Sequence, residues 1–243
     1  MMMKEIKLKV KKHREKTLME ALLDEGVTVA GTCGGRGSCG KCKVKADGKD
    51  VLACREKVTA DVTILVDDGW EDVNVKTSAL QLPEGFICDA AEPGTYGIAL
   101  DLGTTTVVVM LWDLASGILV DVEAASNPQR FYGADVMSRI SFVLRAPWNL
   151  KRLQSSLIND VNQTINKLIM GHGIKLGQIR KITAVGNTAM SHFFLGEDVS
   201  GLGAYPFQPA FTGSVLTTAR ALGLAAHEEA EVYIAPNIAG HVG

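Results

Sequence analysis

The chain has 243 residues, 47% of them hydrophobic, and a formal net charge of −2 at pH 7. This size and apolar content suffice for one or two domains with their own cores, and the near-neutral charge gives no reason to expect nucleic-acid binding. No apolar run approaches the roughly 18 residues of a membrane span, and the charged N-terminus is unlike a signal peptide. We therefore expect a cytoplasmic protein with no membrane and no nucleic-acid partner.

The N-terminal part of the chain carries the patterns of short strands and one helix. The stretch IKLKV alternates apolar residues with lysines, at the period of a half-buried strand. Thr17 and Glu20 have capping-box spacing at the start of an apolar helical pattern. Two more short strands are expected after a cysteine-rich loop, at residues 41–46 and 61–66. These patterns predict a small first domain of mixed α+β type.

The cysteine-rich loop, GTCGGRGSCGKC at residues 31–42, places three cysteines and five glycines in twelve positions. With one more cysteine downstream, the spacing is C-x5-C-x2-C and a distant fourth, close to the plant-type 2Fe-2S pattern. Glycines allow the positive φ angles with which backbone N–H groups turn toward sulfur; they stand at positions 31, 34, 35, 37 and 40. The predicted cluster ligands are Cys33, Cys39, Cys42 and Cys54.

Two other interpretations of these cysteines stay open at this point. A single zinc ion would take the same four thiolates, but zinc ribbons usually offer two C-x2-C pairs and this chain has one. The thiols could also be unligated. Cys88 stands apart, and we expect no role for it because the other four complete a site. The stretch CGGRGSCGKC…VLAC resembles the β-grasp ferredoxins, although the eleven residues between Cys42 and Cys54 predict a trimmed loop over the cluster.

A linker and a second domain follow. Residues 71–94 are irregular and acidic, so we expect domains at 1–70 and 95–243 joined by this linker. The second domain opens with two apolar strands that meet at the turn DLGTTT. Helices are then expected at residues 134–145 and 149–173, a strand turning into a helix at 179–194, and a last strand from residue 231.

The turn DLGTTT has the chemistry of a phosphate-binding hairpin. Gly103 lets the backbone approach a ligand closely, and the N–H groups of Thr104 and Thr105 can hold phosphate oxygens. Asp101 can hold Mg²⁺, through water. An ordinary β-turn rich in threonine would look similar, so the motif alone is moderate evidence for a nucleotide site.

The order of motifs resembles one family. YGIALDLGTTTVVV resembles the first phosphate motif of the actin, sugar kinase and chaperone ATPase superfamily. NPQRFYGADVMSRI, AVGNTAMSHFFLG and APNIAGHVG, behind a ferredoxin domain, together resemble the reductive activators of corrinoid proteins. This resemblance implies an α/β fold in which a β-grasp 2Fe-2S domain precedes one ribonuclease-H-like lobe of an actin-type ATPase.

The resemblance also implies a function. The 2Fe-2S cluster would pass one electron to an inactive Co(II) corrinoid and restore Co(I), with ATP and Mg²⁺ assisting the transfer. The implied partners are a corrinoid protein and an upstream electron donor, and a homodimer through the second domain is left open. The alternatives are a simple 2Fe-2S electron carrier with a partner-binding second domain, and a small-molecule kinase, which the attached cluster disfavours.

Several residues of the second domain have less certain roles at this stage. The superfamily binds nucleotide between two lobes, and Gly243 falls inside the stretch that resembles the second phosphate loop. We therefore expect an incomplete lobe with weak or no ATP binding, which leaves enzyme activity of this chain open. Thr188 is expected as a helix N-cap or as a phosphate contact. No mechanism suggests itself for Asn127, Arg130 and Asp135, and a structural role is expected for them.

Overall fold

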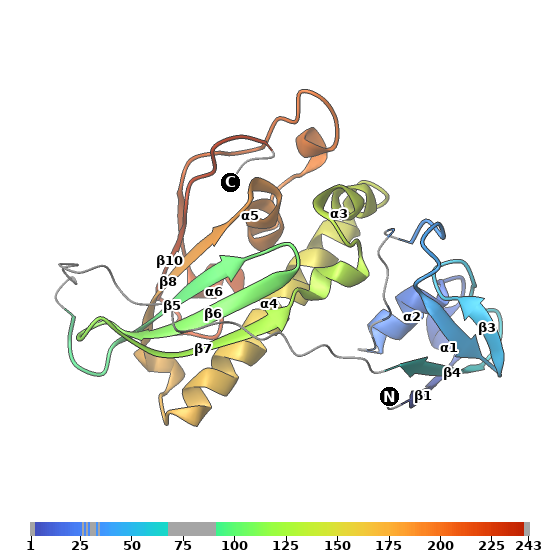
Figure 1. The fold of residues 1–243 in the computed structure, drawn as a ribbon, viewed down its shortest axis with the longest axis horizontal. Helices are drawn as coiled ribbons and strands as arrows, with labels where there is room; N and C mark the ends of the chain where they lie inside the picture. Colours follow the sequence, from blue (N-terminus) through green and yellow to red (C-terminus); the bar gives the residue numbers. More distant parts are fainter. Residues whose placement is uncertain are drawn as a thin grey trace. The chain divides into compact units, whose positions relative to one another are not determined.

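Two separate β-sheets organise the computed structural model of the chain (Figure 1). The model describes residues 3–25, 27, 29, 33, 35–67 and 91–240. It forms two compact units, Met1–Glu71 with Gln129–Arg145 and Asp72–Pro128 with Ala146–Gly243, and each is described by itself. Cys88 and most of the expected linker lie outside the described residues, so the domain boundaries near residues 70 and 94 stay a prediction.

The N-terminal unit is built on a four-stranded sheet in the order β1-β4-β2-β3. All neighbouring strands are antiparallel: β1 (Met3–Leu8), β4 (Val62–Asp67), β2 (Lys43–Ala46) and β3 (Lys49–Leu52). The helices α1 (Val10–His13) and α2 (Leu18–Asp24) follow β1 along the chain. Leu18 and Leu22 of α2 share a buried core with Val44 and Ile64 of the sheet. The α+β first domain expected from the sequence is therefore confirmed.

Helix α2 begins where the sequence predicts. The backbone N–H of Thr17 donates to Oε2 of Glu20 over 2.9 Å, and the N–H of Glu20 donates to Oγ1 of Thr17 over 3.2 Å. This reciprocal pair is a capping box, and it satisfies two N–H groups that a helix start leaves without an intrahelical partner. The helix that leads into the cysteine loop therefore has a fixed start.

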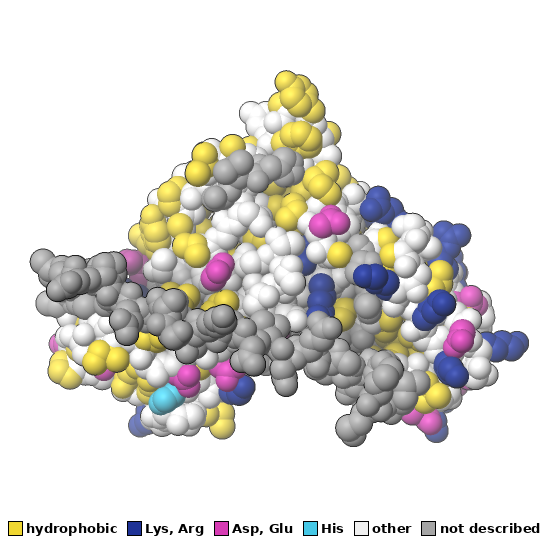
Figure 2. Space-filling model, in the orientation of Figure 1, with side chains coloured by type: hydrophobic (Ala, Val, Ile, Leu, Met, Phe, Trp, Pro, Cys, Tyr) yellow, Lys and Arg dark blue, Asp and Glu magenta, His cyan; other side chains and the backbone are white. Residues whose placement is uncertain are grey.

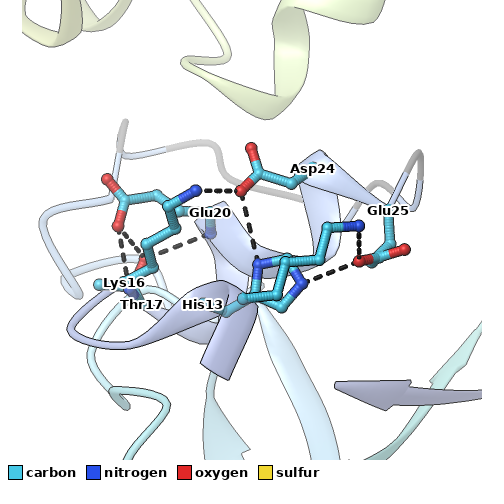
Figure 3. Close-up of polar contacts among 7 residues, drawn as sticks. His13, Lys16, Thr17, Glu20, Asp24 and Glu25 are labelled. Carbon is cyan, nitrogen blue, oxygen red and sulfur yellow. Dashed lines mark hydrogen bonds and ion pairs between the residues drawn. The ribbon is translucent and has the colours of Figure 1, made fainter. Parts of the chain in front are cut away.

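Ion pairs surround the other end of α2 (Figure 3). The buried His13 ring places Nε2 2.8 Å from Oε1 of Glu25, which Lys12 also contacts at 2.7 Å. Nζ of Lys16 lies 2.5 Å from Oδ2 of Asp24. The positive charges of Lys12 and Lys16 near this helix end therefore face carboxylates of the same unit.

The second unit is built on a six-stranded sheet in the order β7-β6-β5-β8-β10-β9. Strands β5, β8 and β10 are parallel to one another, and the remaining strands join antiparallel at both sides. The strands are β5 (Tyr96–Leu102), β6 (Thr106–Asp113), β7 (Ile118–Ser126), β8 (Ile179–Gly186), β9 (Val215–Thr218) and β10 (Glu231–Ile234). An antiparallel hairpin pair followed by parallel strands in this order is the ribonuclease-H-like arrangement that the sequence predicted.

Helices of this unit pack on the sheet. α4 (Trp148–Gly171) packs on β6, β7 and α5 (Thr188–Leu195), and α5 packs on β8. The sequence places an apolar stripe at helical spacing on α4. It is half-buried at Leu150 and buried at Leu153, Leu157, Val161, Ile165 and Leu168. The short helix α6 (Ala219–Leu222) packs on β9. None of the helices in the described part of the chain has both the length and the apolar character of a membrane span.

The segment around α3 (Val136–Val143) follows β7 and precedes α4 along the chain. Asp135 is the N-cap of this helix, because its carboxylate accepts the N–H of Ser138 over 2.8 Å. The Arg139 side chain is fully buried, and its Nε donates to the carbonyl oxygen of Gly133 over 2.9 Å. Burial lowers the pKa of Arg139 to about 10, still well above neutrality. These contacts support the structural role expected for Asp135.

Candidate functional site

The β2–β3 hairpin brings two of the four predicted cysteine ligands together. Cys42 directly precedes β2 and Cys54 follows β3, and the two strands pair so that Lys43 faces Leu52. The N–H of Ala53 donates to the carbonyl oxygen of Cys42 over 2.9 Å, which extends this pairing to the cysteines. Their Sγ atoms lie 3.3 Å apart, and both residues are buried. The hairpin therefore presents two sulfurs at the same end of the sheet.

The other two cysteines interact with each other. Burial raises the pKa of Cys33, but hydrogen bonds from the Cys39 backbone, the Cys39 side chain and nearby N–H groups lower it more, to about 6. Burial, the Cys42 side chain and the negative charges of Cys42 and Cys33 raise the pKa of Cys54 to about 12. Cys33 thus interacts with Cys39, and Cys54 interacts with Cys42 and with the charge of Cys33. The sulfurs therefore form two pairs, Cys33 with Cys39 and Cys42 with Cys54.

The glycine-rich backbone turns N–H groups toward these sulfurs, as the sequence predicted. Gly37 has a φ of +75°, and its N–H interacts with the sulfurs of both Cys33 and Cys54. A Cβ at this position would lie 2.7 Å from Cδ of Arg55, so a side chain here would have to displace the exposed Arg55 side chain. Gly35 and Gly40 adopt positive φ as well, whereas Gly31 and Gly34 lie outside the described residues.

Pairs of thiols fit a binuclear cluster. In a 2Fe-2S cluster each of the two irons takes two protein ligands, and Cys₄ is the usual set. Within the part of the chain that the structure describes, no three His, Cys, Asp or Glu side chains are arranged to hold a single metal ion. The pairing of the sulfurs therefore fits the predicted 2Fe-2S cluster.

The predicted phosphate hairpin lies at the end of β5. A Cβ on Gly103 would lie 2.3 Å from the carbonyl oxygen of Thr106, so this turn closes only around glycine. Asp101 is exposed at the last part of β5, Thr105 is exposed, and Thr104 is half-buried. Because the parallel strands β5 and β8 pair from Tyr96 to Leu102, the turn lies beside the end of β8. Asp101, Gly103, Thr104 and Thr105 therefore lie together at the carboxyl end of β5, next to the carboxyl end of β8.

Two asparagines hold this turn. The buried Asn127, directly after β7, donates from Nδ2 to the carbonyl oxygen of Gly103 over 2.8 Å. Its backbone N–H donates to the carbonyl oxygen of Thr105 over 2.7 Å. Asn187, after β8, donates from Nδ2 to Oγ1 of Thr104 over 3.0 Å. Sequence reasoning found no mechanism for Asn127, because its partners lie more than twenty residues away and the strand pairing must be known to see them.

The prediction for Thr188 is wrong in one respect. Asn187, not Thr188, is the N-cap of α5, since its Oδ1 accepts the N–H of Met190 over 3.0 Å. Thr188 is the first helical residue, and its hydroxyl donates to the carbonyl oxygen of Ala239. An asparagine is at least as good an N-cap as a threonine, so the helix begins one residue earlier. The Thr188 side chain joins α5 to the segment after β10.

The segment after β10 reaches the same edge. Asn237 is buried; Oγ of Ser191 lies 3.4 Å from its Oδ1, and its backbone N–H donates to the carbonyl oxygen of Thr212. Its Nδ2 has no hydrogen-bond partner among the described residues. His241 and Gly243, in the predicted second phosphate loop, lie outside those residues. The ends of β5, β8 and β10 therefore bring polar groups to the carboxyl edge of the sheet, where open α/β sheets bind ligands.

The neutral ring of His192 connects the first turn of α5 to the segment around Ala210. Its Nδ1 lies 2.6 Å from the carbonyl oxygen of Thr188, and its Nε2 accepts the N–H of Ala210 over 3.1 Å. A carbonyl oxygen only accepts and a backbone N–H only donates, so Nδ1 carries the proton and Nε2 does not. The ring is fully buried and stacks on Phe211 with centroids 4.3 Å apart. Burial therefore lowers the pKa of His192 below its usual value, outweighing the opposing effect of the Thr188 carbonyl.

Acid is expected to destabilise the second unit through His192. Because its pKa is depressed by folding, the unfolded chain binds the proton more readily. The stability contribution is complete above the unfolded pKa of about 6.5 and is lost as the pH falls below it. Melting curves from about pH 7.5 to about pH 5 should show a steeper loss of Tm for the parent protein than for His192→Gln.

The partly exposed His172, beside Asp121 at 2.8 Å, supplies a matched control. His172→Gln should keep the steep acid loss of the parent protein, because it leaves the buried ring of His192 in place. Parallel curves for the parent and His192→Gln would contradict this account of the buried ring.

Comparisons with known proteins bear on both units. Residues 4–68 match the family described as a 2Fe-2S iron-sulfur cluster binding domain, and residues 96–243 match the family described as the RACo middle region. A similar curated protein is the corrinoid activation enzyme RamQ of Eubacterium limosum, 28% identical over 176 residues, which are 72% of this chain and 30% of that protein.

The fold is shared with a solved structure. The reductive activator for corrinoid, iron-sulfur protein matches 93% of this chain and 53% of its own, with a TM-score of 0.65 and 23% identity. This chain therefore spans about half or less of the length of both relatives. Since the family match covers well over half of the residues, the chain belongs to the family of the RACo middle region, here preceded by a 2Fe-2S iron-sulfur cluster binding domain.

Proposed function

We propose that this protein takes part in the reductive activation of a corrinoid protein. In this proposal an electron passes through the N-terminal unit to a Co(II) corrinoid, which becomes Co(I), and ATP binding assists the transfer. The observation that carries the proposal is the pairing of four cysteines in a loop whose N–H groups face sulfur. The relatives support it, since both are named for the activation or reduction of corrinoid proteins.

The cysteine loop would hold the cofactor. A bound 2Fe-2S cluster supplies a one-electron carrier. We assign its ligands to Cys33, Cys39, Cys42 and Cys54, with the first two on one iron and the last two on the other. The N–H of Gly37 would help to stabilise the negative charge of the thiolates. The short connection from Cys42 to Cys54 is the β2–β3 hairpin alone, which limits how much of the chain covers the site.

The hairpin after β5 would contribute part of a phosphate site. In a peptide unit the C=O and N–H point in opposite directions, and Asn127 holds the carbonyl oxygens of Gly103 and Thr105. The N–H groups of the same two peptide units, those of Thr104 and Thr106, therefore point away from Asn127. We propose that they face phosphate oxygens together with the N–H of Thr105, which the sequence predicts as a phosphate contact beside Thr104, and that Asp101 holds Mg²⁺ through water.

The energetic need for ATP follows from the reaction. Each 100 mV of adverse potential costs about 2.3 kcal/mol for one electron, because ΔG equals −nFΔE. Binding and hydrolysis of a nucleotide can offset several such steps if they change the affinity of the partner complex. A cluster loop and a phosphate hairpin in one chain would supply the electron carrier and one part of the nucleotide site for this coupling.

A direct test uses the reduced protein and a corrinoid protein in the Co(II) state, under strictly anaerobic conditions. Formation of Co(I), followed by its visible spectrum, should require the cluster. Because weak ATP binding is expected, it should increase only at Mg-ATP concentrations high enough to occupy a weak site. Cluster oxidation and reduction that is indifferent to ATP would favour the simple electron carrier instead. The upstream donor and a homodimer through the second unit belong to the same proposal, and sedimentation of the purified protein tests the dimer.

A further inference from the structure

Four cations flank the cysteines of the N-terminal unit: Arg36, Lys41, Lys43 and Arg55. All four side chains are exposed. From Cys33 to Lys45 the sequence contains no Asp or Glu. The loop that presents the cysteine sulfurs is therefore surrounded by positive charge without acidic residues in between. We name these four residues the cysteine-flanking cations.

The cysteine-flanking cations differ from other cations of the same unit in their partners. Lys7, Lys9, Lys12 and Lys16 each form an ion pair with a carboxylate of the unit. Among the described residues, no carboxylate lies within ion-pair distance of a cysteine-flanking cation. Nε of Arg36 donates to the carbonyl oxygen of Cys33 over 3.1 Å, which fixes the side chain to the loop and leaves its charge uncompensated. These four lysines are thus neutralised within the unit, whereas the cysteine-flanking cations are not.

The cations lie at one end of the four-stranded sheet. Lys43 begins β2 next to Cys42, and Arg55 follows Cys54 after β3. The Arg55 side chain lies across the cysteine loop, since Cδ is 2.7 Å from where a Cβ of Gly37 would stand. Lys7 and Lys49 lie toward the opposite end, where β2 turns into β3 and the N–H of Asp47 donates to the carbonyl oxygen of Thr63. Figure 2 shows Lys and Arg side chains gathered over this unit.

We propose that the cysteine-flanking cations form a docking surface for an acidic face of a redox partner protein. Opposite charges around two redox centres steer the encounter and fix its orientation, which brings the centres close without a large apolar interface. Exposed charges that pair within their own protein contribute little to such steering, so the unpaired set at the loop is the relevant one. The inference rests on the proposed cluster and adds to it the chemistry of the partner's surface.

A second role for the cations must be separated from docking. Positive charge near an anionic cluster also stabilises its reduced form and so raises its reduction potential. A change of potential alters the driving force toward every oxidant in the same direction. A docking field acts in opposite directions on anionic and cationic oxidants. Two probes of opposite charge therefore distinguish the two roles.

The test measures oxidation of the reduced protein in a stopped-flow instrument. Ferricyanide takes one electron from the cluster and becomes ferrocyanide, and hexaamminecobalt(III) takes one electron and becomes cobalt(II). Lys41→Glu with Lys43→Glu should slow the ferricyanide reaction roughly tenfold at low salt and accelerate the cobalt reaction. Both differences should vanish when the ionic strength rises from about 10 mM to about 1 M, where the Debye length falls to roughly 3 Å.

A matched control changes the same net charge elsewhere on the unit. Lys7→Glu with Lys49→Glu should leave both probe reactions near the rates of the parent protein. Equal effects of the two double variants would show that only net charge matters and would overturn the docking surface. If the oxidation rates with ferricyanide and with hexaamminecobalt(III) changed in the same direction, the cations would act only on the reduction potential of the cluster. That result would also overturn the docking surface. A preparation without cluster absorption would instead contradict the proposed function.

Equilibrium binding gives a readout that does not depend on electron transfer. A fluorescein-labelled oligoglutamate peptide stands in for the acidic partner face, and its anisotropy is measured against protein concentration. Binding should weaken with salt and should be lost in Lys41→Glu with Lys43→Glu, but not in the control variant. Binding that is equal in the two double variants would reject an acidic partner at this face.

Discussion

Replacing Cys42 by serine is expected to remove the visible absorption of the purified protein and most of its iron. The Cys42 sulfur lies 3.3 Å from that of Cys54, so the change would remove one of the two ligands that we assign to the same iron. The parent protein should be reddish-brown, with about two irons and two sulfides per chain. Metal analysis and the visible spectrum of an anaerobic preparation measure both. Serine at Cys33, Cys39 or Cys54 should have the same effect.

The fifth cysteine provides the control for this experiment. Cys88 is not one of the four predicted ligands, so the spectrum and iron content should not change in Cys88→Ser. The serine variants at the ligands are also expected to melt earlier, since a site that binds metal only in the folded state adds its binding energy to folding. Stoichiometric zinc and a colourless parent protein would reject the cluster and the electron-transfer function together.

Replacing Gly103 by alanine is expected to destabilise the second unit and disturb its phosphate hairpin. The new Cβ would lie 2.3 Å from the carbonyl oxygen of Thr106, and a backbone oxygen cannot move aside as the end of a flexible side chain can. The turn would have to open, which also weakens its bonds with Asn127. We expect a loss of about 1–3 kcal/mol, seen as a lower Tm in thermal unfolding.

Gly213→Ala is the matched control for this change. Its Cβ would meet no heavy atom within 4 Å, so the same substitution should leave the Tm nearly unchanged. Exchange of the amide hydrogens of Thr104 and Thr106 should become faster in Gly103→Ala and not in Gly213→Ala. Equal melting temperatures for the two variants would mean that the turn tolerates a side chain, and would weaken its assignment as a close-approach site.

Local patterns account for what the sequence predicts well. The Thr17–Glu20 capping box and the α4 stripe each depend on residues within a few turns, and the structure agrees with both. The spacing of the four cysteines is likewise a local pattern, and their role as cluster ligands stays a prediction. The strand β3 was not predicted, because four residues between a turn and a cysteine show too little alternation to identify a strand. The same holds for β9 and α6, which are four residues each.

Interactions between distant residues account for what the sequence does not predict. Asn127 acts on a turn that precedes it by two strands, and the meeting of Thr188 with Ala239 depends on the parallel pairing of β8 with β10. The error at Thr188 came from two adjacent residues that both suit an N-cap, where only the backbone path decides. The second asparagine, Asn187, could have been found by weighing N-cap preference at that pair.

The bonds from Asn127 and Asn187 have a consequence for the time course of binding. Hydrogen bonds from these two side chains of the protein fix the shape of the turn at Gly103, so no ligand is needed to fix it. A ligand that meets this turn does not have to order it first, and little conformational entropy is lost at that step. Encounter with the turn should then be a single step, whose observed rate rises in proportion to ligand concentration and shows no plateau.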